Sequence, residues 1–407
     1  MKKLMLIGVG QMGRPYVAAA GRLGVSVHAV EAASRADQVT GTASVAQARG
    51  ELDEHWMEGA CLALQDGPFD GVIAFNEPQV IAAAMIQDRF GLPGPSLHAA
   101  TASRNKALQR ALFTAAGITQ PAYTVTDSLA EEMAWAAERW PVIVKPLSSA
   151  GSDGVELVTD AESFRAVAQA RAGERVIVEE AIDGPEYSWE ALVRDGEVWF
   201  ANVTAKETTG PPQFVEVGHR TGVHLPESSA RQVADTGARV LRALGMRTGL
   251  VHMEFRLSAA GPVPIEVAVR TPGDYLMDLL GATYGIDWYE MVVRMAVGMP
   301  LPQPPVGPFR HAASIFTISE PGVVQDIRGL DAVRSHPSVL QAGVEVEPGD
   351  TVLAVRSSGH RTGEVVLAAP SSPELESAIT FVQQTLVVTT ISPHSTQTDT
   401  AVNDVEP

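Results

Sequence analysis

The sequence contains one cysteine, Cys61, among 407 residues. A single thiol excludes a disulfide framework and a zinc site made of several thiolates, and it suits a reducing compartment. Basic residues are also few, because 30 Lys and Arg stand against 48 Asp and Glu and leave a net charge of −18. A surface that binds nucleic acid needs an excess of basic side chains, so we expect no nucleic-acid partner.

The sequence also lacks a long apolar run. No stretch reaches the ~18 apolar residues that a transmembrane helix needs, and Gly8 and Gly10 end the apolar start of the chain. We therefore expect no membrane partner and a cytoplasmic location. With 45% hydrophobic and 19% charged residues, the composition is that of a globular protein. Its length predicts two or three domains.

The first third of the chain predicts a Rossmann-like domain over residues 1–95. Apolar strands alternate there with helices, as in a parallel sheet. The expected strands are 4–7, 25–30 and 71–75. The glycine loop Gly8-x-Gly10-x-x-Gly13 follows the first strand, and Glu31 ends the second. This is the context of a dinucleotide site, so an NAD-dependent oxidoreductase using this loop is an alternative function, although the same glycines serve any tight strand-to-helix turn.

Two proline-rich linkers, at 92–96 and 301–305, divide the rest of the chain. We expect a central region with a mobile lid, then a β-rich C-terminal cap and a polar, disordered tail. The corresponding ranges are 96–305 for the central region, about 120–205 for the lid, 306–390 for the cap and 391–407 for the tail.

The central region holds two glutamates that interrupt apolar strands. The pattern predicts strands at 249–257 and 263–270 joined by a turn, with Glu254 on the first and Glu266 on the second. Paired strands lie about 4.8 Å apart, so the two carboxylates can face one point. Two unpaired buried carboxylates are costly, and a hard cation such as Mg²⁺, with Mn²⁺ as the alternative, removes the conflict. Two exposed glutamates paired with surface arginines are the other interpretation.

A lysine and a loop of small residues together indicate an anion site. Lys145 lies on the apolar strand 141–146, which runs into a loop whose backbone N–H groups can form an anion-binding nest. The loop residues are Ser148, Ser149, Gly151, Ser152 and Gly154. Lys106 lies in the first turn of a helix, where a cation opposes the helix dipole, and this favours a functional role. A hairpin turn with a solvated lysine is the alternative.

A further strand, 175–180, ends in two acids, Glu179 and Glu180. Backbone groups from Glu180 to Ile182 are suited to reading an adenine edge, and Glu186 to accepting hydrogen bonds from ribose hydroxyls. Taken singly, these acids are explained equally well as solvated side chains.

In this order along the chain, the motifs resemble those of the ATP-grasp superfamily over about residues 98–300. The resemblance implies an ATP-grasp fold, with α/β and α+β parts, and an ATP-dependent ligase that joins a small carboxylic acid to an amine through an acyl phosphate. It assigns the α- and β-phosphates to Lys106 and Lys145, and the triphosphate to residues 148–154. Further nucleotide contacts are assigned to Glu179, Glu180, Ile182 and Glu186. The metal is assigned to Glu254 and Glu266, and the γ-phosphate or acyl phosphate to Arg270.

The pattern Glu266-Val-Ala-Val-Arg270-x-Pro-Gly is similar to the branch that includes L-amino-acid (dipeptide) ligases. Ala268 stands where many ATP-grasp enzymes have Asn, which leaves the metal with two carboxylates. The resemblance also places His219 near the substrate and makes Lys206 a weaker nucleotide-side candidate.

Several features of the substrate side stay open. Asp274 either reads a cationic amine of the acceptor or starts the next helix. The general base is undecided among His219, Glu216 and the phosphate itself. The acceptor is a free amine or a carrier-protein thiol, and a homodimer is compatible with the sequence.

Overall fold

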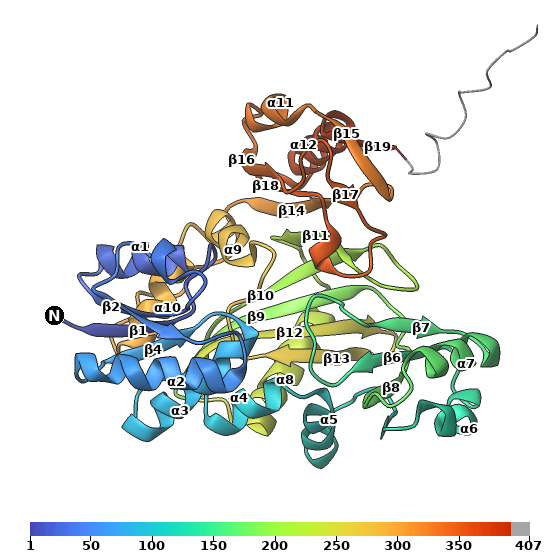
Figure 1. Ribbon diagram of the computed structural model, residues 1–407, viewed down its shortest axis with the longest axis horizontal. Helices are drawn as coiled ribbons and strands as arrows, with labels where there is room; N and C mark the ends of the chain where they lie inside the picture. Colours follow the sequence, from blue (N-terminus) through green and yellow to red (C-terminus); the bar gives the residue numbers. More distant parts are fainter. Residues whose placement is uncertain (392–407) are drawn as a thin grey trace, which may run out of the picture.

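The computed structural model describes residues 1–391, so all of the expected tail except Ile391 lies outside the described residues. The N-terminal domain is a four-stranded parallel sheet in the order β3-β2-β1-β4. Its strands are β1 (Lys3–Ile7), β2 (Ser26–Ala32), β3 (Ser44–Ala48) and β4 (Gly71–Ala74). Helix α1 (Arg14–Arg22) covers one face, and α2 (Asp53–Ala63) and α3 (Val80–Phe90) cover the other (Figure 1).

The glycine loop between β1 and α1 is occupied by the chain itself. Glu31 Oε2 accepts hydrogen bonds from the N–H groups of Val9 (2.7 Å) and Gly10 (2.9 Å), and the glutamate is 1% exposed. Burial raises the pKa of Glu31, but these backbone hydrogen bonds outweigh it and lower the pKa. A carboxylate therefore already holds N–H groups that a pyrophosphate would need. The loop acts as a structural turn, which argues against the oxidoreductase alternative.

The central structure is an antiparallel eight-stranded sheet in the order β13-β12-β9-β10-β11-β14-β18-β16. Its strands are β9 (Glu186–Arg194), β10 (Glu197–Thr208), β11 (Glu216–Thr221), β12 (Gly249–Ser258), β13 (Gly261–Ala268), β14 (His311–Thr317), β16 (Val339–Val344) and β18 (Gly363–Ala369). The last three belong to the expected C-terminal cap, but β14 pairs with β11 and extends the central sheet. The cap and the core therefore share one sheet.

A second layer completes the C-terminal part. The three-stranded sheet β17-β15-β19 and two helices pack beside β14, β16 and β18 (Figure 1). Their bounds are β15 (Gly322–Arg328), α11 (Leu330–Arg334), β17 (Thr351–Val352), α12 (Ser372–Thr385) and β19 (Val387–Ile391).

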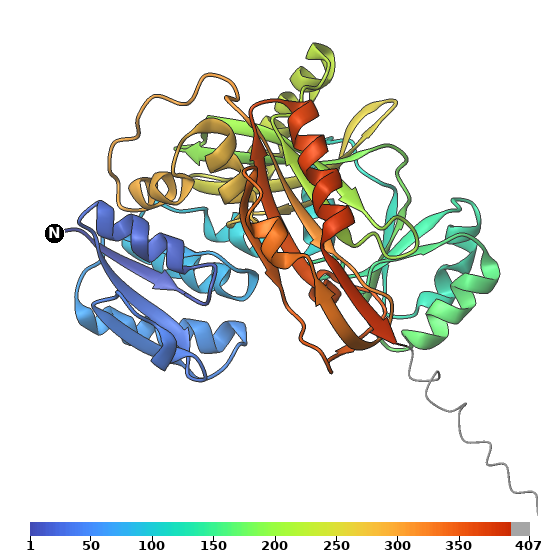
Figure 2. The same cartoon turned by 90° about the horizontal axis from the view of Figure 1, so that it is seen from above.

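The lid is a separate four-stranded sheet in the order β5-β8-β6-β7. Its elements are β5 (Tyr123–Thr126), α6 (Met133–Ala137), β6 (Val142–Pro146), β7 (Glu156–Val158), α7 (Ala161–Ala170) and β8 (Val176–Glu180). The expected lid range of 120–205 extends beyond this sheet, because β9 and β10 pair within the large sheet. Figure 2 shows the lid and the N-terminal domain at opposite ends of the molecule. Movement of the lid stays a prediction.

Helices fix the N-terminal domain to the large sheet. The core helices are α4 (Leu97–Ser103), α5 (Lys106–Ala115), α8 (Glu227–Leu244), α9 (Leu276–Tyr284) and α10 (Trp288–Ala296). Short 3₁₀ turns elsewhere in the chain are η1 (Ala36–Gln38), η2 (Leu64–Asp66), η3 (Glu77–Gln79), η4 (Leu129–Glu132) and η5 (Ser358–His360). One apolar cluster contains Leu4 and Tyr16 of the N-terminal domain together with Trp288 of α10. A Cβ at Gly237 of α8 would lie 2.8 Å from the Trp189 ring, so this glycine lets α8 approach β9 closely. Over residues 1–391, each helix is too short or too polar to cross a bilayer.

Candidate active site

A cavity of about 560 Å³ lies between the lid sheet and the large sheet. Most of the residues that the sequence singles out line it: Lys106, Lys145, Ser149, Gly151, Ser152, Glu179, Glu180, Ile182, Glu186, Glu254 and Glu266. They come from α5, β6, the β6–β7 loop, β8, the β8–β9 loop, β9, β12 and β13. The other candidates, Ser148, Gly154, Lys206, Arg270 and His219, lie outside its lining.

Glu254 and Glu266 are direct partners across the β12–β13 ladder. Glu254 Oε1 lies 3.1 Å from Lys206 Nζ, and Glu266 Oε1 lies 3.0 Å from Lys106 Nζ. In the described part of the chain, the Oε2 atom of each glutamate accepts no hydrogen bond. About a quarter of each side chain, 25% and 26%, stays exposed. The pair therefore presents one uncommitted oxygen from each strand.

This donor set fits a hard divalent cation. Mg²⁺ is usually held by one or two carboxylates and completes its shell with water and substrate phosphates, and Mn²⁺ takes the same oxygen ligands. Among residues 1–391, no group of three or more His, Cys, Asp or Glu is arranged to hold a metal ion. An ion at Glu254 and Glu266 would thus depend on phosphate oxygens, as the alanine at 268 also implies.

A buried histidine orients Glu254. His252, which the sequence did not single out, contacts Glu254 Oε1 through Nε2 (3.3 Å) and Glu190 Oε1 through Nδ1 (3.0 Å). Burial lowers the pKa of His252, but hydrogen bonds to the two acids outweigh burial and raise it to about 9. Thr204 also donates to Glu190 (2.6 Å), so the supporting acid is itself held in place.

Lys206 lies beneath the cavity with its side chain 1% exposed. Its Nζ contacts Glu186 (2.9 Å), Glu216 (3.5 Å) and Glu254 (3.1 Å). Burial lowers the pKa of Lys206, but the three acids outweigh it and raise the pKa well above its ordinary value. The lysine thus neutralises acids that line the cavity. Direct contact between Lys206 and a nucleotide stays a prediction.

Both oxygens of Glu179 are taken by cations. Lys145 Nζ lies 2.7 Å from Oε2, and Arg110 Nε donates to Oε1 over 2.6 Å. Burial raises the pKa of Glu179, but these two cations outweigh it and lower the pKa to about 2. Glu179 therefore orients Lys145, and its contact with a nucleotide stays a prediction. Arg110 was missed by sequence reasoning, although it lies one helical turn after Lys106 on α5.

Lys106 connects the loop 148–154 to the pair formed by Glu254 and Glu266. Its Nζ donates to the Ser149 carbonyl (2.8 Å) and contacts Glu266 (3.0 Å), and its side chain is 4% exposed. Asn105 caps α5 by accepting from the Leu108 N–H (3.0 Å), which fixes Lys106 in the first helical turn. The predicted phosphate lysines, Lys106 and Lys145, thus reach the same cavity from different elements.

The other end of the cavity is lined by the segment that follows β8. The N–H of Glu180 donates to Ala122 O (2.9 Å) and that of Ala181 to Pro141 O (3.1 Å). Within the described residues the N–H of Ile182 has no partner, so it remains available to an adenine edge. Glu186 is held by Lys206 and by Arg256 Nη2 (3.0 Å), and its contact with a ribose stays a prediction.

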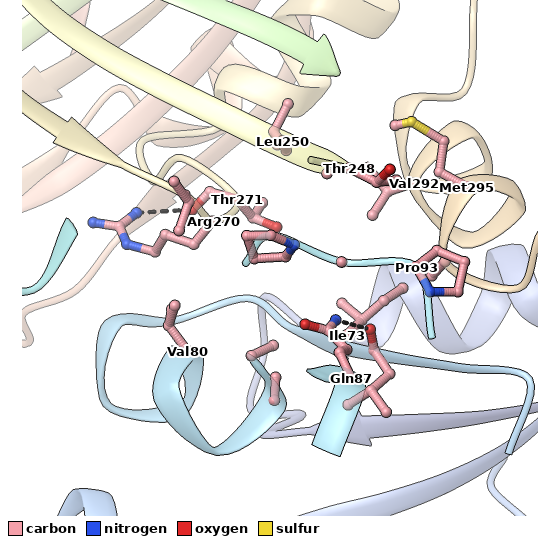
Figure 3. A pocket seen from close by; sticks show the side chains of 18 residues that line it. Ile73, Val80, Gln87, Pro93, Thr248, Leu250, Arg270, Thr271, Val292 and Met295 are labelled. Atoms are coloured by element: carbon pink, nitrogen blue, oxygen red, sulfur yellow. Dashed lines mark hydrogen bonds between the residues drawn. The ribbon is translucent and has the colours of Figure 1, made fainter. Parts of the chain in front are cut away.

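Arg270 lies on the far side of the acid pair, beside the N-terminal domain. Its Nε donates to Glu77 Oε1 (2.9 Å), and Arg104 Nη1 donates to the other oxygen (3.3 Å). Arg270 borders a smaller cavity of about 60 Å³, which Figure 3 shows between α3, Pro93 and Met295. The lining is largely aliphatic, so this space is a packing seam between domains, with Arg270 at its edge.

His219 is 2% exposed and lies on β11. Its Nε2 contacts Asp274 Oδ2 (2.9 Å), and Arg361 Nη2 donates to Asp274 Oδ1 (2.7 Å). Both Asp274 oxygens have partners, but each can accept a further hydrogen bond, so contact with a substrate amine stays a prediction. The alternative, in which Asp274 starts the helix, needs correction, because α9 begins at Leu276 after Tyr275. No local sequence signal pointed to Arg361, which lies 87 residues beyond Asp274.

Two family models match the chain. Residues 138–278 match the model described as an ATP-grasp domain, and residues 314–390 match the model described as L-amino acid ligase C-terminal domain 2. The uncharacterized protein y4rH of Sinorhizobium fredii is 30% identical over 336 residues, which cover 80% of this chain and 69% of that protein. This chain belongs to the ATP-grasp superfamily. The C-terminal match confirms the expected resemblance to the L-amino-acid ligase branch.

Other similarities agree with an ATP-grasp assignment. The crystal structure of an L-amino acid ligase from Bacillus licheniformis has a TM-score of 0.81 at 22% identity, covering 96% of this chain and 99% of that one. This likeness confirms the expected fold class. Carnosine synthase 1 of Gallus gallus is 26% identical over 405 residues, which cover 89% of this chain and 43% of that protein. The ATP-grasp chain thus spans less than half of that relative.

Proposed function

We propose that this protein is an ATP-dependent ligase that activates a small carboxylic acid, an amino acid or a similar metabolite, and joins it to an amine. The products are an amide or dipeptide, ADP and phosphate. One observation carries the proposal: Glu254 and Glu266 face each other at a cavity that Lys106 and Lys145 also line. Two acids beside two lysines suit a metal-bound triphosphate.

The chemistry follows from the charges around that point. A carboxylate oxygen of the acid attacks the γ-phosphorus, and the bond to the ADP oxygen breaks with its electron pair. Balance of the charge on the phosphoryl oxygens is assigned to Lys106 and Lys145 in the cavity lining and to Arg270 outside it. Magnesium, when bound, neutralises part of the phosphate charge as a Lewis acid. The amine then attacks the acyl carbon, phosphate leaves with the bonding electrons, and the amine proton is lost.

The substrate side is assigned to His219 and Arg270. His219 is held by Asp274 over 2.9 Å, and Arg270 is held by Glu77 over 2.9 Å, so both side chains are fixed before substrate arrives. The match of residues 314–390 to the model described as L-amino acid ligase C-terminal domain 2 supports an amino-acid substrate.

A screen of acid and amine pairs tests the function. Purified protein with ATP and Mg²⁺ is expected to release ADP only when a matching acid and amine are both present, and mass spectrometry is expected to find the amide. If a carrier protein replaces the amine, a thioester on the carrier identifies thiol loading instead. ADP release that needs neither acid nor acceptor, or NADH oxidation without ATP, would reject the ligase.

A further inference from the structure

A short loop of the C-terminal domain contacts the active site at two points. The loop, residues 357–361, contains η5 and precedes β18. The Ser358 N–H donates to the carbonyl oxygen of Gly151 over 3.1 Å. Gly151 belongs to the loop 148–154, which borders the cavity. Ser358 Oγ also lies within hydrogen-bond distance of Glu216 Oε2 (2.8 Å) and of the Gly151 carbonyl oxygen (3.3 Å). Ser358 of the C-terminal domain thus contacts both the loop 148–154 and Glu216, an acid that lines the cavity.

The other end of the loop contacts the substrate side. Arg361 donates from Nη2 to Asp274 Oδ1 (2.7 Å), while Asp274 Oδ2 contacts His219 Nε2 (2.9 Å). The guanidinium carbon of Arg361 lies 3.7 Å from the centre of the Phe316 ring, which supports the arginine from one side. Arg361 therefore holds the acid that orients His219.

A hydrogen bond inside the loop joins these two ends. Arg361 Nε donates to the Ser358 carbonyl over 2.9 Å, so the two residues are in direct contact. Asp274 and Tyr275 have φ of 56° and 61°, a conformation that residues with side chains keep only when their surroundings hold it. Arg361 and His219 supply part of that restraint. The loop thus links Gly151 on the nucleotide side to His219 on the substrate side.

We propose that Ser358 and Arg361 are positioning residues of the ligase site. Ser358 latches the loop 148–154 over the nucleotide. Arg361 holds Asp274, which keeps His219 in the orientation that the substrate requires. This inference rests on the proposed function, because it takes His219 to face the substrate. It gives the C-terminal domain a part in assembling the site.

The latch is tested by Ser358→Ala with Ser357→Ala as the control. Ser357 lies beside Ser358, and within the described residues its side chain has a hydrogen bond only with His360 of the same loop. Ser358→Ala keeps the backbone hydrogen bond to Gly151 but removes the Oγ contacts with Gly151 and Glu216. This loss is expected to raise the KM for ATP roughly three- to tenfold, while the control stays unchanged. Equal KM values for ATP in the two variants would overturn the latch.

The substrate-side contact is tested by Arg361→Gln, with the exposed Arg356 changed to Gln as the control. Arg361→Gln is expected to lower kcat/KM for the acid or amine about 10- to 100-fold while the KM for ATP stays within about twofold. Arg361→Lys is expected to recover part of this loss because it keeps the charge. The nitrogen NMR signal of His219, assigned with His219→Asn, is expected to shift only in the Arg361 variants. An unshifted His219 signal in Arg361→Gln would overturn the proposal that Arg361 positions His219.

A separate measurement distinguishes failure of the latch from failure of the ligase. Hydrogen exchange of the peptide 147–155 is measured with and without ADP and Mg²⁺. Slower exchange in the wild type and in Ser357→Ala, but not in Ser358→Ala, supports the latch even if no acid and amine pair is ligated. Equal slowing in all three proteins overturns the latch even if ligation is observed.

Discussion

Lys145 and Glu179 form an ion pair of 2.7 Å, with each side chain less than 5% exposed. Lys145 lies on β6 and Glu179 on β8 of the lid, and Arg110 of α5 takes the second oxygen of the glutamate. One acid thus fixes a lid lysine and a core arginine beside the cavity. The three charges sum to one positive charge, which suits an anionic ligand.

Removing the acid from this cluster is expected to destabilise the protein. Glu179→Gln leaves Lys145 and Arg110 buried without a counter-charge, and breaking a buried pair in this way costs about 3–5 kcal/mol. Urea unfolding at neutral pH measures the change. The matched control is Glu180→Gln, at the exposed neighbouring residue, where a change within about 0.5 kcal/mol is expected. Equal unfolding midpoints for the two variants would show that the pair contributes nothing.

The same glutamate predicts a dependence of stability on pH. Burial raises the pKa of Glu179, but Lys145 and Arg110 lower it from 4.5 to about 2. A lowered pKa gives stability that is complete above about pH 4.5 and is lost as the pH falls towards 2; the full effect is roughly 3 kcal/mol. The difference in unfolding free energy between wild type and Glu179→Gln should therefore narrow over this range. A difference that stays constant from pH 7 to pH 2.5 contradicts the assignment.

The acid pair predicts a requirement for a divalent cation. Glu266→Gln removes one charged ligand, so ligation is expected to slow about 10²–10³-fold and to need more Mg²⁺ for half-activation. Glu197→Gln, at an exposed strand position, is the control. EDTA is expected to abolish activity, and Mg²⁺ or Mn²⁺ to restore it. If Glu266→Gln and the control share one Mg²⁺ activation curve, the metal site lies elsewhere.

Glu77 is expected to position Arg270 across the domain boundary. Glu77→Gln weakens the hydrogen bond to Arg270 Nε, so kcat is expected to fall roughly tenfold with little change in the KM for ATP. Asp53→Asn serves as the control because Asp53 pairs with Arg104, the other partner of Glu77, and not with Arg270. Similar kcat values for both variants would place the effect in Arg104 or in general packing.

Local pattern was enough to predict the elements that carry the site. Strands with apolar side chains at every second position, joined by a short turn, predicted the β12–β13 hairpin and the pairing of Glu254 with Glu266. The strand with Lys145 and the loop after it were also predicted. Strand β3 was missed, because Ser44–Ala48 contains one β-branched residue, Val45, and no large apolar side chain. The limits of the lid and cap depended on strand pairing between distant segments.

The sequence by itself predicted most of the charged groups that line the cavity, because the spacing of charged residues within a strand or helix decides which face they share. Only the tertiary structure decided how the charges pair. Glu179 meets Arg110 across 69 positions, and Asp274 meets Arg361 across 87. Such contacts arise when separately formed elements pack, and any of several acids would have satisfied each cation until packing and burial selected one.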